Sequence, residues 1–261
     1  MTIEYHEAPA ADLVRIPEPW KSSAVTVVLP TYQEAANISA MVEAIFNLPL
    51  TNLRVMVVDD NSPDGTGRIA EELAVKYGQD RMSVVHRKGK EGLGRAYVDG
   101  MTRAIDGGAE FVAQMDCDLS HRPEHLPEMI GTILSTNADV VIGSRYIACA
   151  SVGAEWPWHR KTLSAFANLY VRRMLGMNIR DVTAGYKLWR ASALQTIGLP
   201  RIHSTGYSFQ VEMNYLAIKN NLKAIELPIH FPDRQQGESK MSLGVQLESA
   251  LMPFKLRRHA R

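Results

Sequence analysis

The sequence predicts an α/β fold built around a mainly parallel sheet. Short runs rich in β-branched residues alternate with segments of helical apolar spacing, in the order strand, helix, strand, helix, strand. Two of the strand-like runs end abruptly in aspartates, at Asp59-Asp60 and at Asp116-Cys117-Asp118. Ligands of open α/β sheets bind at the carboxyl ends of the strands, so the same pattern predicts where the functional site lies.

Length and composition limit the number of domains and the kinds of partner. A chain of 261 residues with 46% hydrophobic residues can bury one large core. The net charge of +1 argues against a nucleic-acid-binding surface. Cys117 and Cys149 have neither disulfide-framework nor zinc spacing, which favours a reduced, cytoplasmic protein. No apolar run reaches the roughly 18 to 20 residues of a membrane span, so we expect any membrane contact at the surface.

The first third of the chain supplies the alternation of strands and helices. Residues 1–22 contain Pro9, Pro17 and Pro19 without a sustained period, so we expect a flexible or loosely docked arm. We then expect a strand at 24–29, a helix through 38–45 that Asn37 caps, a strand at 53–58, a helix at 67–77 and a strand at 83–86.

The loop after the strand at 53–58 is more acidic than a turn requires. Asp59, Asp60 and Asp64 lie within six residues. Carboxylates there can accept hydrogen bonds from a ribose or from the amide edge of a base. Turn and helix-cap chemistry explains the same residues equally well, so the sequence leaves both interpretations open.

A glycine-rich turn at Arg87–Gly94 contains Lys88 and Lys90 and leads into a helix expected from residue 95. Backbone N–H groups at a helix N-terminus, together with these cations, predict an anion cradle. The turn lacks the Gly-Lys-Ser/Thr of a Walker A loop, and no Gly-x-Gly-x-x-Gly follows the first strand. P-loop and dinucleotide-dehydrogenase functions therefore lose their main support.

Asp116 and Asp118 end the apolar run that starts at Phe111. Alternate residues of an extended chain share a face, so we expect the two carboxylates on one side and Cys117 on the other. Two neighbouring carboxylates repel each other unless a cation lies between them, and hard oxygen ligands suit Mg²⁺ or Mn²⁺. A substrate diphosphate would also bind such a cation. A solvated turn is the alternative for a motif this short.

The second half of the chain continues the pattern around an irregular segment. Residues 147–160 hold Trp156 and Trp158 beside basic residues, a composition typical of a membrane-interface anchor or of a lid over a phosphate. A loop held by aromatic packing is the alternative. We expect helices from 123, at 162–175 and from 206, strands at 139–143 and 225–231, and an amphipathic, basic tail at 246–261.

Five motifs occur in an order that resembles the family 2 inverting glycosyltransferases. They are Val27–Glu34, Val57–Thr66, Arg87–Gly94, Asp116–Asp118 and Gly143–Tyr146. More narrowly, the chain resembles the dolichol-phosphate mannose synthases and the actinobacterial polyprenol monophosphomannose synthases, over about residues 24 to 245. Because a short motif gains weight from its predicted context, the ordered set favours metal binding by the two aspartates over a solvated turn.

The resemblance implies a GT-A fold, which is an α/β fold with a Rossmann-like, mainly parallel sheet flanked by helices. It divides the chain into the arm at 1–22, a catalytic domain at 23–245 and the tail at 246–261.

The resemblance also implies roles for individual residues. Those expected to bind the donor are Pro30, Tyr32, Glu34, Asp59, Asp60, Lys90, Gly92, Leu93, Asp116, Asp118, Arg234 and Lys240. Those expected at the acceptor phosphate are Arg145, Arg160 and Ser164. The metal is expected on Asp116, Asp118 and Ser120, although relatives commonly have Gln at the last position. The residues expected to act in catalysis are Asp118, Arg145, Arg234 and Lys240.

Asp181 is a further candidate, in a segment that resembles the family's Asp-x-x-Ser-Gly-Phe/Tyr. It is expected to bind sugar hydroxyls or to orient an arginine, and helix capping is the plain alternative. Thr183 could substitute for the serine of that segment.

The function implied is transfer of mannose from GDP-mannose to a polyprenyl monophosphate, with a divalent metal and inversion of the anomeric centre. The enzyme would work at the cytoplasmic face of a membrane, bound peripherally or through a separate membrane-anchor protein. A phosphate monoester is mostly dianionic at neutral pH, so the nucleophile requires positioning rather than a carboxylate base. The alternatives are a polyprenyl-phosphate glucosyltransferase that uses UDP-glucose and a non-catalytic nucleotide-sugar-binding adaptor at the membrane.

Overall fold

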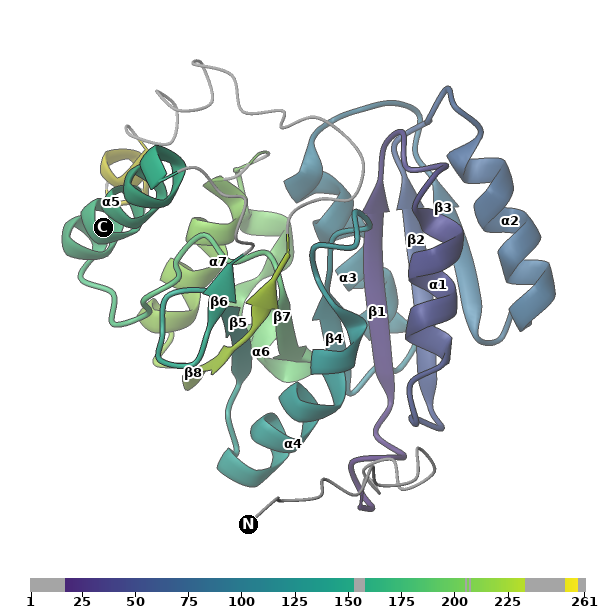
Figure 1. Ribbon diagram of the computed structural model, residues 1–261, viewed down its shortest axis with the longest axis horizontal. Helices are drawn as coiled ribbons and strands as arrows, with labels where there is room; N and C mark the ends of the chain where they lie inside the picture. The colour runs from purple at the N-terminus through teal and green to yellow at the C-terminus, as the bar shows by residue number, and fades with distance from the viewer. Residues whose placement is uncertain (1–16, 153–157, 205, 207, 233–251, 258–261) are drawn as a thin grey trace, which may run out of the picture.

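The computed structural model describes residues 17–152, 158–204, 206, 208–232 and 252–257, with the backbone alone for 158–161 and 163. Seven strands of this part form the central sheet (Figure 1). They are β1 Val25–Thr31, β2 Leu53–Asp59, β3 Met82–His86, β4 Phe111–Gln114, β5 Val140–Ser144, β7 Lys187–Arg190 and β8 Ala224–Pro228. A separate pair consists of β6 Ser151–Val152 and β9 His230–Phe231.

The order of the strands is β3-β2-β1-β4-β7-β5-β8, and all neighbours are parallel except those of β7. Strand β7 lies between β4 and β5 and is antiparallel to both. The sheet is therefore mainly parallel, as predicted. Its single reversed strand brings the segment that precedes β7 to the edge where the other strands end.

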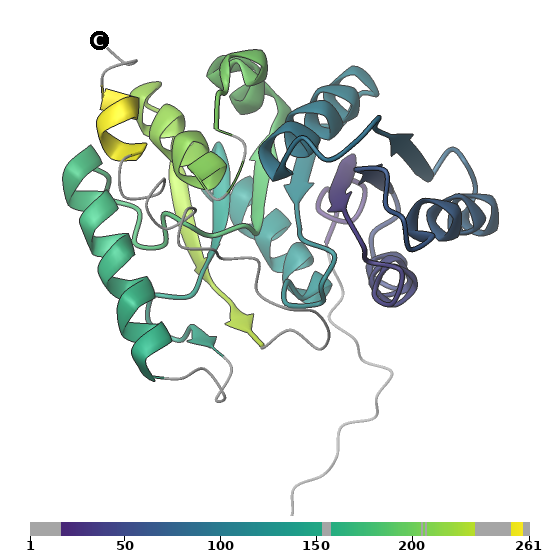
Figure 2. The ribbon, with the colours of Figure 1, turned by 90° about the horizontal axis from the view of Figure 1, so that it is seen from above.

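Helices cover both faces of the sheet, which Figure 2 shows edge-on between two helical layers. One layer contains α1 Ile38–Phe46, α2 Thr66–Tyr77 and α4 Leu126–Thr136, and the other contains α3 Leu93–Asp106, α6 Ala191–Ile197 and α7 Ser208–Lys219. Helix α5 Trp158–Leu175 and the helical segment 252–257 pack at the end of the second layer. The short 3₁₀ helices are η1 Pro123–His125 and η2 Leu199–Arg201.

Alternate residues of the strands enter two separate cores. Val27 and Leu29 of β1 are fully buried in the layer of α1, α2 and α4, whereas Val28 is fully buried in the layer of α3, α6 and α7. Successive side chains of a strand point to opposite faces, so a β-branched run with no polar alternation suits a sheet that is covered on both sides. This explains why the central strands read as continuous apolar runs.

Most of the elements expected from the sequence are confirmed, with boundaries shifted by a few residues. The expected cap is wrong, because Asn37 has right-handed helical backbone angles and makes no side-chain cap hydrogen bond. Its amide instead donates to Glu34 Oε2 at 2.8 Å. The strand expected at 225–231 is interrupted after Pro228, and β7 and α6 were not predicted.

The described part of the N-terminal arm is docked against the body of the molecule. Trp20 packs on the core against Gly131 of α4. The contact is so close that a Cβ added to Gly131 would lie 2.6 Å from the indole ring. The carbonyl of Lys21 accepts hydrogen bonds from the backbone N–H and the hydroxyl of Thr51. Within the described residues, no helix combines the length and the apolar character needed to cross a membrane.

Candidate active site

The predicted site residues gather at the carboxyl edge of the sheet. Asp59 ends β2, Asp116 lies two residues after the end of β4, and Arg145 follows β5 directly. Because β7 runs in the opposite direction, the segment that carries Asp181 enters the sheet at this same edge. The topology therefore places donor-side and acceptor-side candidates around one edge, as expected for ligand binding in an open α/β sheet.

Asp116 and Asp118 lie in the loop after β4 rather than on the strand itself. The side chain of Asp116 is one-third exposed, whereas Asp118 is buried. Asp118 Oδ1 accepts hydrogen bonds from both the backbone N–H, at 3.1 Å, and the hydroxyl of Ser120. Cys117 is buried in the core layer of α1, α2 and α4, where burial raises the pKa of its thiol well above the usual value.

Two neighbouring side chains fix Asp116. The hydroxyl of Tyr97, on α3, donates to Asp116 Oδ1 at 2.8 Å. The backbone N–H of Asp116 donates to His121 Nδ1 at 2.9 Å. Since that nitrogen supplies the lone pair, His121 is the tautomer that carries its proton on Nε2. Burial raises the pKa of the Tyr97 phenol, and the nearby charge of Asp116 raises it further, so the phenol stays a hydrogen-bond donor.

The residues of this loop fit a hard divalent cation by their donor chemistry. Asp116, Asp118 and Ser120 offer oxygen atoms only, which is the ligand set that Mg²⁺ and Mn²⁺ prefer. Within the described part of the chain, no group of three His, Cys, Asp or Glu side chains is placed to hold a metal by itself. The loop therefore suits a cation that shares its coordination with a bound diphosphate. Ser120 is almost fully buried and donates to Asp118, so in this arrangement it supports that carboxylate.

The carboxylates of the acidic loop after β2 are held by contacts within the protein, and their expected role in binding a ribose or a base stays a prediction. Asp59 accepts hydrogen bonds from the hydroxyls of Thr31, at 3.0 Å, and Ser62, at 2.6 Å, while Asp60 is ion-paired with Arg87. Burial raises the pKa of Asp60 despite the opposing charge of Arg87. Asp64, the third aspartate of the loop, accepts a hydrogen bond within the turn before α2.

Asp64 joins the loop after β1 to the start of α2. Its carboxylate accepts hydrogen bonds from the backbone N–H of Ala35, at 3.1 Å, and of Thr66, at 3.1 Å. Burial opposes ionisation, but the hydrogen bonds from Thr66 and Ala35 outweigh it and lower the pKa of Asp64. The turn interpretation is thus confirmed for this residue, whereas the cap position of α2 is Gly65, which makes no side-chain cap hydrogen bond.

Tyr32 and Lys90, both expected at the donor, come together from separate loops. The Lys90 ammonium lies 4.0 Å from the centre of the Tyr32 ring, within cation–π distance. Gly92 immediately precedes α3 with φ of 100°, a conformation that only glycine adopts readily. The glycine-rich turn thus starts α3 at residue 93 and carries Lys90 over Tyr32.

Arg145, which is expected at the acceptor phosphate, forms a buried ion pair with Asp181. The Nε and Nη2 atoms of Arg145 donate to the two carboxylate oxygens of Asp181, each at 2.8 Å, and Nη2 also donates to Thr183 Oγ1 at 2.9 Å. Burial alone would raise the pKa of Asp181, but the charge and hydrogen bonds of Arg145 lower it. Of the roles considered for Asp181, orienting an arginine is the one observed.

Helix α5 is tied to this ion pair through short polar contacts. Ser164 Oγ accepts a hydrogen bond from the Tyr146 hydroxyl at 2.7 Å. Asn168 Oδ1 accepts the backbone N–H of Val182 at 2.9 Å. Ser164 therefore lies next to the residue that follows Arg145, and its expected role at the acceptor phosphate stays a prediction.

Lys187 is a fully buried cation at the start of β7. Its ammonium donates to Gln210 Oε1, which also accepts the side-chain amide of Gln114 at 2.6 Å. Burial lowers the pKa of Lys187 to about 7, and the charges of Asp181 and Asp116 oppose that change. Nothing in the sequence indicates this buried group, because a single lysine in a short apolar segment resembles a surface residue.

Three expected residues cannot be located. Arg234 and Lys240 lie outside the described residues, as does the side chain of Arg160. Their roles stay predictions. The contacts that the sequence did not reveal are those of Tyr97, Thr31 and His121. Tyr97 and Thr31 hydrogen-bond to residues distant in the chain, and His121 accepts a backbone N–H five residues earlier in the same loop.

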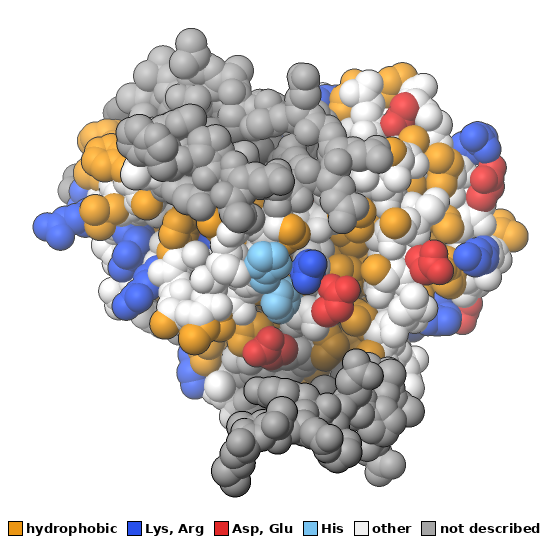
Figure 3. Space-filling view, viewed as in Figure 1, with side chains coloured by type: hydrophobic (Ala, Val, Ile, Leu, Met, Phe, Trp, Pro, Cys, Tyr) orange, Lys and Arg blue, Asp and Glu red, His pale blue; other side chains and the backbone are white. Residues whose placement is uncertain are grey.

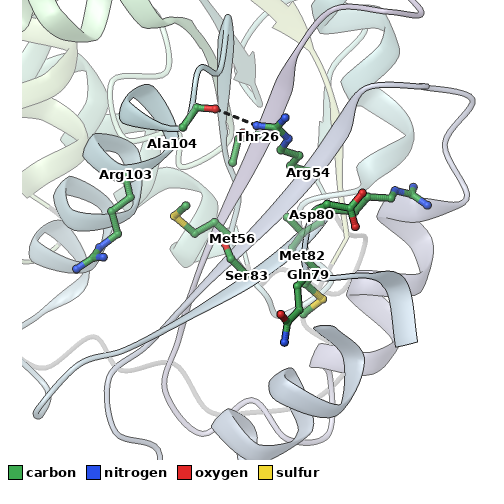
Figure 4. Close-up of a pocket in the computed structure, with 12 residues that line it drawn as sticks. Thr26, Arg54, Met56, Gln79, Asp80, Met82, Ser83, Arg103 and Ala104 are labelled. Carbon is green, nitrogen blue, oxygen red and sulfur yellow. Dashed lines mark hydrogen bonds between the residues drawn. The ribbon is translucent and has the colours of Figure 1, made fainter. Parts of the chain in front are cut away.

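A separate pocket lies at the opposite edge of the sheet (Figure 4). It is lined by residues near the amino ends of β1, β2 and β3, including Arg54, Arg81 and Arg103. Each arginine has a partner of its own, since Arg54 donates to Gly107 O, Arg103 pairs with Asp99 and Arg81 lies over the Phe46 ring. This pocket contains none of the residues expected in the site.

Similarity to known proteins agrees with the geometry. The sequence model of glycosyl transferase family 2 matches residues 26–198. A polyprenol monophosphomannose synthase from Mycolicibacterium smegmatis is 42% identical over 216 residues, which cover 83% of this chain and 80% of the relative. An undecaprenyl-phosphate mannosyltransferase from Micrococcus luteus is 41% identical over 230 residues, 85% of this chain and 88% of the relative.

Solved structures share the fold at low sequence identity. Glucosyl-3-phosphoglycerate synthase from Mycobacterium tuberculosis, bound to Mn²⁺, UDP and glucosyl-3-phosphoglycerate, has a TM-score of 0.63 and 17% identity, covering 91% of this chain and 80% of that structure. A mannosyltransferase from Pyrobaculum calidifontis in complex with GDP-mannose and Mn²⁺ has a TM-score of 0.57 and 15% identity, covering 92% and 74%. The expected GT-A fold is confirmed, and the chain belongs to glycosyl transferase family 2.

Proposed function

We propose that this protein transfers mannose from GDP-mannose to the phosphate of a polyprenyl monophosphate, giving polyprenyl-phosphate-mannose and GDP with inversion at the anomeric carbon. The observation that carries the proposal is the identity of 42% and 41%, over most of the chain, to a polyprenol monophosphomannose synthase and an undecaprenyl-phosphate mannosyltransferase. The site contains groups suited to each part of this reaction.

The acceptor half is suited to a phosphate nucleophile. The second pKa of a phosphate monoester is near 6, so the acceptor is mostly dianionic at neutral pH. One of its oxygens attacks the anomeric carbon while the bond to the diphosphate breaks, and the bonding electrons leave with GDP. No proton has to be removed. Arg145, with Ser164 and Arg160, is proposed to hold the phosphate in line for this attack.

The donor half is suited to a nucleoside diphosphate. Asp116 and Asp118 are proposed to hold Mg²⁺ or Mn²⁺, which would stabilise the charge of the leaving diphosphate when bound. Tyr32, Lys90 and the residues around Asp59 and Asp60 are proposed to bind the nucleoside, and the complex of GDP-mannose with the Pyrobaculum mannosyltransferase supports GDP-mannose as the donor. Pro30, Glu34, Gly92 and Leu93 complete the proposed donor site. Arg234 and Lys240 are proposed to neutralise the leaving group.

Helix α5 supports work at a membrane surface. Its residues Phe166 and Leu169 are 68% and 52% exposed, and Phe254 of the segment 252–257 is 51% exposed. The helix contains no Asp or Glu and has Arg172 and Arg173 in its last turn. On the face in Figure 3, Lys or Arg side chains lie beside hydrophobic ones at the α5 side. An anionic cytoplasmic leaflet would attract such a surface by about 1 kcal/mol per cation.

The division into an arm at 1–22, a catalytic domain at 23–245 and a tail at 246–261 is part of the proposal. Residues 252–257, which are the described part of the proposed tail, pack on the same side as α5. Direct binding of the purified chain to vesicles would support peripheral attachment. Binding only with a second membrane protein would support a separate anchor.

The proposal is tested by supplying two radiolabelled donors to the purified chain. GDP-mannose and UDP-glucose are each incubated with a short polyprenyl phosphate and either Mg²⁺ or Mn²⁺, and the lipid product is extracted. We expect labelled lipid from GDP-mannose only. Labelling from UDP-glucose only would replace mannose by glucose, and nucleotide-sugar binding without transfer would favour a non-catalytic adaptor.

A matched pair of aspartate variants connects this activity with the site. Asp118→Asn keeps the shape of the side chain but removes the charge that holds the cation, so it should abolish metal-dependent labelling. Asp106→Asn removes an exposed aspartate from the far end of α3 and should leave labelling unchanged. Equal labelling by the two variants would refute the metal role of Asp118.

A further inference from the structure

Tyr97 is a buried polar residue next to the proposed metal loop that the reaction described above does not use. It lies on α3 with no exposed surface. Its ring stacks on Phe209 of α7, with the two planes only 3° apart and the centroids separated by 5.7 Å. This packing fixes the direction in which the hydroxyl points.

The hydroxyl is aimed at one particular atom, Asp116 Oδ1, to which it donates at 2.8 Å. A hydrogen bond to a carboxylate is stronger and more directional than one between neutral groups. It comes from an element 19 residues earlier in the chain, so it joins helix α3 to the loop after β4. The orientation of Asp116 is therefore set from outside its own loop.

The backbone of Asp116 is held independently of its side chain. Its N–H donates to His121 Nδ1, and Asp116 Oδ2 lies 3.8 Å from the same nitrogen, beyond hydrogen-bond distance. A Cβ on Gly185 would lie 3.3 Å from that oxygen, so the segment before β7 passes close to it. Oδ1 is directed to Tyr97, and the Asp116 side chain as a whole is one-third exposed.

We propose that Tyr97 is a positioning residue for the divalent cation: its hydroxyl fixes Asp116 through Oδ1 so that Oδ2 faces the cation and the donor diphosphate. This inference rests on the proposed function in two respects, the role of Asp116 as a ligand of the cation and the identity of the donor. Ligands that are oriented by an outer hydrogen bond bind metal more tightly, because the correct geometry exists before the metal arrives. Tyr97 itself touches neither the cation nor the substrates.

The test is Mn²⁺ binding to the full chain with GDP present, followed by electron paramagnetic resonance of free Mn²⁺. Tyr97→Phe keeps the stacked ring and removes only the hydroxyl, and it should weaken Mn²⁺ binding roughly 10- to 100-fold. Binding of GDP without metal should not change. Tyr77→Phe, on the distant helix α2, is the matched control and should bind Mn²⁺ as the wild type does.

A double-variant cycle separates positioning from a general structural effect. If Tyr97 acts through Asp116, then Tyr97→Phe has no further effect on Mn²⁺ affinity once Asp116→Asn is present. An equal loss in both backgrounds, wild-type affinity in Tyr97→Phe, or no Mn²⁺ binding by the wild type would each overturn the inference. The proposed function fails in a different way, when wild-type protein that binds Mn²⁺ and GDP transfers no mannose.

Discussion

Arg145 illustrates how a buried ion pair can shape a phosphate site at the scale of single residues. Among the described residues, its hydrogen bonds use Nε and Nη2, on Asp181 and Thr183. In the proposed function, the acceptor phosphate meets a guanidinium that these hydrogen bonds already hold. Asp181 is itself held by the backbone N–H of Arg145 and by its own N–H to Glu226. The guanidinium is thus oriented before any phosphate arrives, which lowers the entropic cost of binding.

Asp181→Asn should therefore cost both stability and acceptor binding. Removing one partner of a buried pair leaves the other charge uncompensated, and we expect a loss of about 3 to 5 kcal/mol in the free energy of unfolding. Urea unfolding at pH 7 measures this loss, and the KM for polyprenyl phosphate should rise more than that for GDP-mannose. The exposed Asp106→Asn variant is the control. An unchanged free energy of unfolding would contradict the structural role of the pair.

The pH dependence of the same pair has a definite sign. The pKa of Asp181 is lowered in the folded protein, so its stabilisation is present above the ordinary aspartate pKa of about 3.9. It is lost as the pH falls through the lowered folded value. The difference in stability between the wild type and Asp181→Asn should accordingly shrink only in strongly acidic solution.

The location of a site residue was predictable from the sequence where the residue belongs to a motif. It was not predictable where the residue acts through a partner that is distant in the chain. Asp116, Asp118 and Arg145 stand at strand ends and were visible in the pattern. The bond from Tyr97 depends on how α3 packs against the loop after β4, and nothing local to residue 97 indicates it. For the ion pair between Arg145 and Asp181, the sequence indicated only that orienting an arginine was one of several roles open to the aspartate.

At the scale of elements, β7 is a strand that the pattern of polar and apolar residues did not predict. Its four residues, Lys-Leu-Trp-Arg, have no alternation of polar and apolar types, yet the first three are fully buried. The strand forms because β4 and β5 offer open edges on both sides, which is tertiary context that a short segment does not record. The longer parallel strands were predictable because burial on both faces makes them continuous apolar runs.

The buried lysine of β7 makes folding stability depend on pH. The pKa of Lys187 is about 7 in the folded protein, against about 10.4 when unfolded, so the unfolded chain holds more protons between these values. The cost of burying the charge is complete below pH 7 and is relieved as the pH rises. Lys187→Met should therefore be more stable relative to the wild type at pH 6 than at pH 9. We expect this stability difference to change by about 1 to 3 kcal/mol between the two pH values.

Urea unfolding of both proteins at the two pH values measures this difference. The exposed Lys76→Met variant on α2 is the control and should show no such dependence. A difference between Lys187→Met and the wild type that is the same at pH 6 and pH 9 would show that Lys187 does not titrate in this range.

Helix α5 provides a second test at the scale of elements. Replacing Phe166 and Leu169 by serine removes exposed apolar area that burial in a membrane interface would stabilise. We expect weaker sedimentation with anionic phospholipid vesicles and unchanged transfer to a short, soluble polyprenyl phosphate. Val75→Ser, at a 74% exposed position on α2, is the matched control. Equal vesicle binding by all these proteins would remove α5 from the membrane surface.

At the scale of the whole molecule, the fold brings the residues proposed for the two substrates to one edge of the sheet. Strands β1, β2 and β4 place the residues proposed to bind the donor, and β5 with the antiparallel β7 places those proposed to bind the acceptor. The sequence could predict the α/β class and this edge, because strand ends rich in aspartate mark it. It could not predict the order of the strands or the reversal of β7, which depend on pairings between distant segments.

The measurement that tests the central claim most directly compares two acceptors that differ only in the phosphate. Purified chain, GDP-mannose labelled in the sugar and Mn²⁺ are incubated with a short polyprenyl phosphate or with the corresponding polyprenol. The account predicts labelled lipid with the phosphate acceptor alone, because the dianion needs no base and the alcohol does. Mannose transferred to the polyprenol, or to neither lipid, would contradict it.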